Sequence, residues 1–315
     1  MKHAFTALMI FAAIMSAVTA GDDKSPKFKI TTKRDTDTVE VRADKDKTLF
    51  PLFDLETRSQ ALADFAGTIA GVLRSPEPTL ASLLTTRKFV VRPRTAALLG
   101  WSDLQGLSPD GSTLEASEPG RSGILTHPVF LASFAHANET NPVARGHFVS
   151  SNILCVNIPP PPQAVTFPER TNDATPRTLR QVLQSEHSMS TCAGCHQFMD
   201  PVGYPFEVFD AVGKLRSTDN GLPIDASGSI SGAGEIDGPV ASAQEMLGKI
   251  AGSARAQDCF AERVYKYVAG VDASPALECS TSGLKSRFRE QQGNVLELVV
   301  GLLQSPEFLS REVVP

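Results

Sequence analysis

Residues 55–76 read LETRSQALADFAGTIAGVLRSP. Leu62, Phe65 and Ile69 recur at the three- and four-residue spacing that places side chains on one face of a helix, with Ala and charged residues between them. Ser75-Pro76 ends the pattern, because proline lacks an amide donor and disfavours helical geometry in the residue before it. The stretch therefore predicts an amphipathic helix that turns one apolar face to a core.

The same spacing recurs outward from this helix, so the expected fold is mainly α. Further helices are expected over 93–99, 128–135, 142–155, a run opened by Thr175-Pro176, 243–251, 256–269 and 284–303. The Gly-rich residues 213–238 predict a small β-hairpin excursion, and the four prolines 159–162 predict an extended polyproline segment. We expect helical subdomains joined by that segment.

Residues 1–20 have the pattern of a secretory signal peptide. Lys2 supplies the positive start, residues 4–18 are uncharged and largely apolar, and Val18-Thr19-Ala20 stands at the cleavage position. The apolar stretch is shorter than the ~20 residues that a bilayer-crossing helix needs. We expect cleavage near Ala20 and a periplasmic or secreted mature chain with no membrane span.

The rest of the chain divides by composition and pattern. The expected parts are a charged lead-in over 21–54, an N-terminal helical region over 55–112, a central domain over 113–238 and a C-terminal helical module over 239–315. A formal charge of −5, from 30 Lys+Arg against 35 Asp+Glu, and the lack of a long basic run argue against nucleic-acid binding. No nucleophile arrangement of the Ser/His/Asp kind is evident, which favours a redox carrier over a turnover enzyme.

The strongest chemical signal is Cys192-Ala193-Gly194-Cys195-His196. Cys-x-x-Cys-His is the pattern to which haem c is covalently attached, with both thiols bonded to the haem and the histidine bound to iron. On a helix this spacing brings both sulfurs to one turn, next to His196. Export supports the interpretation independently, because haem attachment takes place outside the cytoplasm. We expect an exported, mono-haem electron-transfer protein that serves an unidentified redox partner protein.

Other chemistries for the motif stay open. A zinc site would use Cys195, His196 and His187, although adjacent ligands suit one tetrahedral ion poorly. A thioredoxin-like dithiol or a Cys192–Cys195 disulfide would need no metal at all. The alternative function is therefore a structural or partner-binding accessory module of a secreted degradative complex, with the motif metal-bound or oxidised. A haem enzyme with an open iron position is a third hypothesis.

Several stretches together resemble the planctomycete cytochrome c-associated domains of unknown function. They are Arg121–Thr126, Asn141–Gly146, Cys192–Gly203, Phe206–Arg216, Ile224–Gly228, Arg263–Gly270 and Ser305–Phe308. The resemblance covers roughly residues 55–312 and implies an exported protein with a central Cys-x-x-Cys-His motif and a helical C-terminal module. Relatives usually carry a longer helical region at the N-terminus, and several carry a separate cytochrome c domain, so this chain resembles a shortened member.

Two further assignments complete the expectations. A low-spin haem needs a second axial ligand, for which Met246 ranks first because its place after the hairpin lets it reach the far face; His187 ranks second and a vacant position third. In an oxidising compartment we expect a disulfide between Cys259 and Cys279, which flank a turn between two C-terminal helices. Cys155 is then left as a buried thiol.

Overall fold

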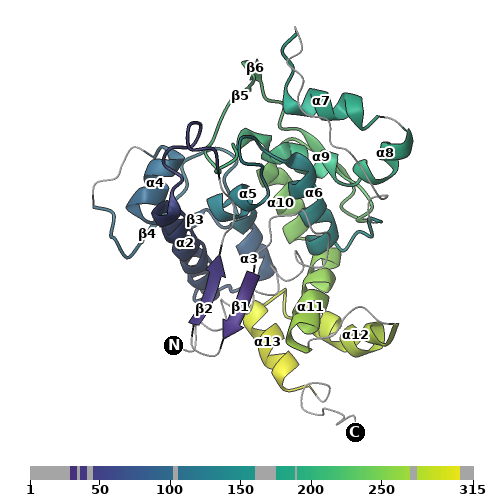
Figure 1. Cartoon of the computed structure of the whole chain (residues 1–315). Coiled ribbons are helices and arrows are strands. Elements are labelled where there is room, and N and C mark those ends of the chain that lie inside the picture. The colour runs from purple at the N-terminus through teal and green to yellow at the C-terminus, as the bar shows by residue number, and fades with distance from the viewer. Residues whose placement is uncertain are drawn as a thin grey trace.

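The computed structural model describes residues 29–33, 36–40, 45–101, 106–159, 175–188, 190–269 and 275–305, with side chains from residue 45 onward except at 190–191, 269 and 275–280. The expected signal peptide and nearly all of the proline run lie outside these residues. Within them the chain is mainly α, as predicted (Figure 1). The division into domains stays a prediction.

Twelve α-helices lie in the described part of the chain, joined by three short helical turns. The α-helices are α2 (Leu55–Leu73), α3 (Leu80–Thr85), α4 (Pro93–Leu99), α5 (Pro128–Ser133), α6 (Pro142–Phe148), α7 (Leu179–Glu186), α8 (Ser190–His196), α9 (Asp200–Gly203), α10 (Ala243–Ala251), α11 (Ala254–Ala269), α12 (Pro275–Glu290) and α13 (Val295–Leu303). The 3-10 turns are η1 (Ile124–Thr126) and η3 (Tyr204–Val208), and η2 (Val149–Ile153) is a π-helical turn.

The strands form small antiparallel hairpins. The pairs are β1 (Lys29–Lys33) with β2 (Thr36–Glu40), β3 (Lys88–Val91) with β4 (Ser112–Glu115), β5 (Thr218–Asp219) with β6 (Leu222–Pro223), and β7 (Gly228–Ile230) with β8 (Gly238–Val240). The expected excursion over 213–238 is thus two hairpins, the second ending at Val240. The β3–β4 hairpin was not expected, because its second strand interrupts a stretch rich in Gly, Ser and Pro.

Local signals place most helix ends. Asp54 caps α2 by accepting a hydrogen bond from the Thr57 amide at 2.8 Å, and α4 stops at Gly100, which adopts a φ of 76°. The single helix expected over 284–303 is wrong. Gln292 and Gly293 both have positive φ, and Asn294 then caps a new helix, so α12 and α13 are separate.

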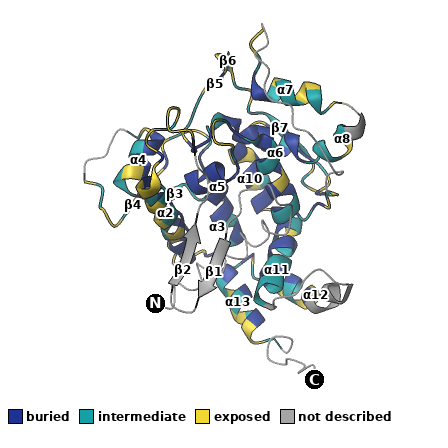
Figure 2. Ribbon diagram, viewed as in Figure 1, coloured by how far each residue is buried: buried dark blue, intermediate teal, exposed yellow. Residues whose placement is uncertain are grey.

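One large apolar core runs through the molecule. It draws buried side chains from α2, α3, α5, α10, α11 and α13, and these helices turn their buried faces to the centre of the fold (Figure 2). Beside it, α6 and α9 pack backbone to backbone. A Cβ on Gly146 of α6 would lie 1.9 Å from the Met199 carbonyl oxygen, and one on Gly203 of α9 would lie 1.9 Å from that of Pro142. Only glycine permits this approach, which fixes α9 against α6.

Two fully buried arginines hold the chain that follows α9. Arg145 donates to the carbonyl oxygens of Leu131, Phe206, Phe209 and Asp210 at 3.0–3.2 Å. Arg121 donates to the carbonyl oxygens of Thr126 and Gly213, both at 2.7 Å. Each guanidinium satisfies several buried carbonyls at once, so η3 and the following turn are tied to α5 and α6.

The expected Cys259–Cys279 disulfide is wrong, because Cys259 pairs with Cys155. Cys155 follows η2 in a left-handed conformation with a φ of 49°, which turns the chain toward α11. Arg255 on α11 donates to the Leu154 carbonyl oxygen at 2.7 Å, and Arg263 donates to that of Ser151 at the same distance. The face of α11 that carries Cys259 therefore lies on η2.

None of the described helices is both long and apolar enough to cross a lipid bilayer.

Candidate functional site

The motif lies on a peripheral part of the fold, which we call the α7–α8 arm (residues 175–188 and 190–199). In Figure 1 the arm lies over α9 at the edge of the molecule. Most described side chains of α7 are exposed or half-buried, whereas residues of α6 and α9 include fully buried ones (Figure 2). The arm therefore presents its side chains outside the main core.

A small set of polar contacts positions α7. Thr178 and Gln181 form a capping box, and the Leu179 amide donates to the carboxylate of Asp219 at 2.5 Å. Arg180 donates to the Ser227 carbonyl oxygen at 2.6 Å, and its guanidinium lies 4.7 Å from the centre of the Tyr204 ring. These contacts tie the helix to β5, to the turn before β7 and to η3, so that its end points toward α9.

The structure places Cys192, Cys195 and His196 together on α8, as the sequence predicts. Both cysteines are half-buried thiols. The two cysteines are three positions apart, so they lie on one helical turn, and His196 is the last residue of the helix. The motif is therefore accessible at the surface of the arm.

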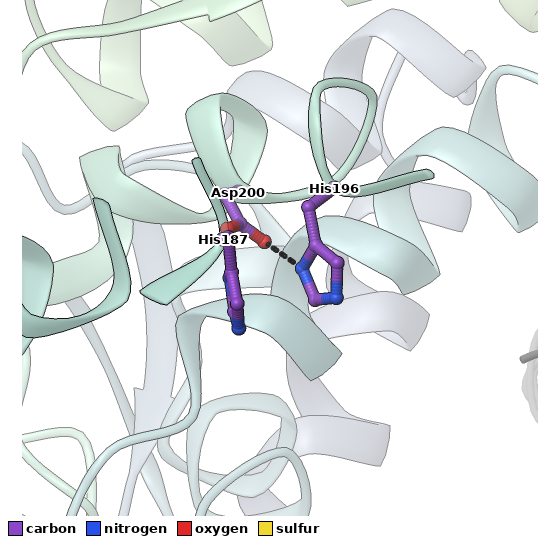
Figure 3. Close-up of side chains that lie close together, drawn as sticks. All are labelled: His187, His196 and Asp200. Atoms are coloured by element: carbon purple, nitrogen blue, oxygen red, sulfur yellow. Dashed lines mark hydrogen bonds and ion pairs between the residues drawn. The ribbon is translucent and has the colours of Figure 1, made fainter. Parts of the chain in front are cut away.

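His187 and His196 converge on one buried carboxylate (Figure 3). Nδ1 of His187 lies 2.5 Å from Oδ2 of Asp200, and Nδ1 of His196 lies 2.9 Å from Oδ1 of the same residue. The imidazole rings lie against each other with centroids 3.6 Å apart. The histidine side chains are 18% and 22% exposed and Asp200 is 6% exposed, so the cluster is mostly shielded from water.

The electrostatics of Asp200 reflect both histidines. Burial by itself raises the pKa of the Asp200 carboxyl, but the hydrogen bonds and charges of His187 and His196 bring that pKa below its ordinary value. Tyr204 lies next to this carboxylate. Burial first, and then the negative charge of Asp200, raises the pKa of the Tyr204 phenol, which keeps the phenol protonated. Asp200 is therefore an ionised carboxylate that accepts hydrogen bonds from its neighbours.

An ionised carboxylate only accepts hydrogen bonds, so each histidine donates its Nδ1–H to Asp200. In a neutral imidazole the other nitrogen, Nε2, then carries a lone pair. Within the described part of the chain, neither Nε2 atom makes a hydrogen bond to protein. Both Nε2 atoms are thus oriented as ligand nitrogens are when a carboxylate holds the opposite side of the ring.

Met246, which ranks first as the expected axial ligand, does not belong to this cluster. It is fully buried in α10, within the main apolar core, and α10 packs against α3. Met246 lies on the apolar face of α10, and Leu247 and Ile250 of the same helix belong to the same core. Of the two candidates, only His187 lies beside His196.

Asp200 is the member of this cluster that the sequence analysis did not predict. The available signal was its spacing, because Asp200 comes four residues after His196 and directly before Pro201. Positions four apart share one helical face only if the helix continues, whereas α8 ends at His196 and α9 begins at Asp200. The contact with His187 also needs the tertiary fold.

The residues of α8 fit a covalently attached haem. The two sulfurs lie on one turn at the surface, and His196 keeps Nε2 available while Asp200 holds Nδ1. The pair of histidines does not fit ligation of both faces of that haem. Ligands on opposite faces have the macrocycle between them, whereas these two rings lie in contact and turn to the same carboxylate.

Comparison with known families gives one match, over residues 121–219, to the family described as "PSCyt3: Protein of unknown function (DUF1588)". Neither the curated proteins nor the solved structures gave a match. The matched stretch is about a third of the chain, and it contains both buried arginines, the motif and Asp200. The central region is thus similar to a family whose function is not described.

Proposed function

We propose that the chain is an exported c-type haem protein that transfers electrons to and from a partner protein. The observation that carries the proposal is the Cys192-x-x-Cys195-His196 helix, in which a buried carboxylate orients the histidine. A haem bound there supplies one-electron chemistry at its iron. The residues that precede the described region support export, since 1–20 have the pattern of a signal peptide.

Each residue of the arm has a distinct role in this proposal. Cys192 and Cys195 would hold the cofactor through thioether bonds, and His196 would bind the iron through Nε2. Asp200 acts through His196: it fixes the ring and would make the imidazole a stronger donor to the iron. Because the arm is peripheral, a cofactor attached there would be within reach of a partner protein.

Neither residue expected as a second iron ligand is placed to complete the ligation of a haem held by His196. Met246 is enclosed in the main core, and the ring of His187 lies against that of His196. A haem bound by His196 alone would be high-spin, and added imidazole or cyanide should then convert it to a low-spin form.

Haem staining after denaturing electrophoresis tests the proposal, because thioether-bound haem stays on an unfolded chain. Protein from a host with exported cytochrome maturation should stain, and the Cys192→Ser, Cys195→Ser double variant should not. His196→Ala should retain the stained band but lose the normal ligation spectrum. A colourless wild-type protein from that host would overturn the haem proposal and leave the accessory-module alternative.

A further inference from the structure

The His187–His196–Asp200 cluster joins three consecutive elements of the chain. His187 follows α7, His196 ends α8 and Asp200 begins α9, so the cluster forms only when all three are in place. One potential ligand atom from each residue lies within 4.8 Å of the others. The grouping includes neither cysteine of the motif. It is therefore a separate donor set that shares only His196 with the haem-attachment residues.

The chemistry of these donors selects a class of ion. Two of the three are imidazole nitrogens, whereas Ca²⁺ and Mg²⁺ prefer oxygen ligands. Imidazole and carboxylate together suit Zn²⁺, Co²⁺ or Fe²⁺. Three protein donors leave at least one coordination position for water or another small ligand.

The site is also prepared by its surroundings. Burial of Asp200 and its short contacts with both rings hold the imidazoles before any ion arrives. Arg180 and the Leu179 amide fix α7, and the close approach of Gly203 to α6 fixes α9. The donors that must meet at one ion therefore belong to segments that are independently anchored.

We propose that Nδ1 of His187, Nδ1 of His196 and the Asp200 carboxylate bind one divalent transition-metal ion of the zinc and cobalt class. The ion takes the place of the two Nδ1 protons that otherwise join the rings to Asp200, and each neutral ring then carries its proton on Nε2. The site is available in the chain that carries no haem. With the ion on Nδ1, the neutral ring of His196 carries its proton on Nε2, the atom that would bind haem iron, so the two states exclude each other. The proposal does not rest on haem attachment, since it uses neither thiol.

The test uses the chain with Cys192→Ser and Cys195→Ser, which cannot attach haem and has no thiols in the motif. After treatment with a chelator, the protein is titrated with Co²⁺ and followed by visible absorption, and Zn²⁺ is used to displace the cobalt. We expect one ion per chain, with a spectrum of nitrogen and oxygen ligands and no thiolate charge-transfer band.

Single replacements then assign the ligands. His187→Ala or His196→Ala should each weaken Co²⁺ binding by more than the ~10–100-fold loss that follows removal of a residue supporting a ligand from outside. Asp200→Asn should weaken binding at least ~10-fold. His136→Ala is the matched control, because His136 is exposed and outside the cluster. Circular dichroism without metal checks that each variant is folded.

Two results would overturn the metal site: no stoichiometric Co²⁺ binding by the double variant, or binding that His187→Ala and His196→Ala leave unchanged. Neither result bears on haem attachment, which is read from wild-type protein. Conversely, the cobalt titration would still test the metal site if the wild-type protein carried no haem. If both proposals hold, wild-type protein saturated with haem should bind Co²⁺ at least ~10-fold more weakly than the double variant.

Discussion

The α6–α9–η3 region and the α7–α8 arm lie next to each other but are held by different means. In the first, Gly146 and Gly203 bring two backbones into contact, and Arg145 satisfies four buried carbonyls. The arm depends on a few polar contacts, chiefly those of Arg180 and Asp200. The comparison shows that the chain carries its Cys-x-x-Cys-His motif outside its tightly packed part and holds it there through a few polar contacts.

The largest expected effect is that of the Cys155–Cys259 disulfide, which ties α11 to the turn after η2 and lies outside the arm. It closes a loop of 104 residues, so its removal by Cys155→Ser and Cys259→Ser should lower the free energy of unfolding by about 4–5 kcal/mol in the chain-entropy model. Urea unfolding of haem-free protein measures the change. The matched double variant in the arm, Cys192→Ser and Cys195→Ser, should leave the unfolding free energy unchanged. Equal losses in both pairs would contradict the account.

Glycine replacements sharpen the same contrast. Gly146→Ala forces a methyl group against the Met199 carbonyl oxygen and should lower the free energy of unfolding by about 3 kcal/mol. Gly194→Ala is the matched change in the arm, where a Cβ meets nothing within 4 Å. It should be neutral or should stabilise α8 by ~0.5–1 kcal/mol. Thermal unfolding measures the stability of both variants. An unchanged free energy of unfolding for Gly146→Ala would show that α6 and α9 are not held this closely.

The smallest effect concerns acid stability. His127 is buried at the start of α5, and burial, with the charge of Arg121, lowers the pKa of His127 to about 3. The unfolded chain binds a proton near pH 6.5 while the folded chain stays neutral, so stability is full above that pH and is lost as pH falls toward 3. We expect a contribution of about 1.4 kcal/mol per pH unit between pH 6 and 5.

His127→Asn should remove that slope while keeping an acceptor for the Val129 amide, to which Nδ1 of His127 is bonded. His136→Asn, at an exposed position, should keep the wild-type slope. Urea unfolding at pH 5, 6 and 7 measures all three proteins. Parallel curves for wild type and His127→Asn would rule out His127 as the source of the pH dependence.

The sequence predicts best what neighbouring residues determine. The ends of α4 and α10 follow from Gly100 and from the period of the apolar residues, and both agree with the structure. The break at Gln292-Gly293 was missed because the apolar spacing continues across it. The motif on α8 could be identified from the sequence because it consists of five consecutive residues.

What the sequence could not predict depends on tertiary packing. Cys155 and Cys259 meet because α11 packs on η2, and no local sequence pattern predicts that contact. Met246 and His187 were ranked by chain length alone, whereas the packing of α10 buries the first and the anchoring of α7 brings the second to Asp200. A carboxylate shared by two histidines is likewise visible only in three dimensions.

The most direct test of the central claim is peptide mapping of wild-type protein from a maturation-competent host, with mass spectrometry of the peptide that contains Cys192–His196. We expect one haem bound through both cysteines of that peptide, and an intact Cys155–Cys259 disulfide elsewhere in the digest. A haem-free peptide, with Cys192 and Cys195 recovered as thiols or joined to each other, would contradict the claim that the arm carries haem.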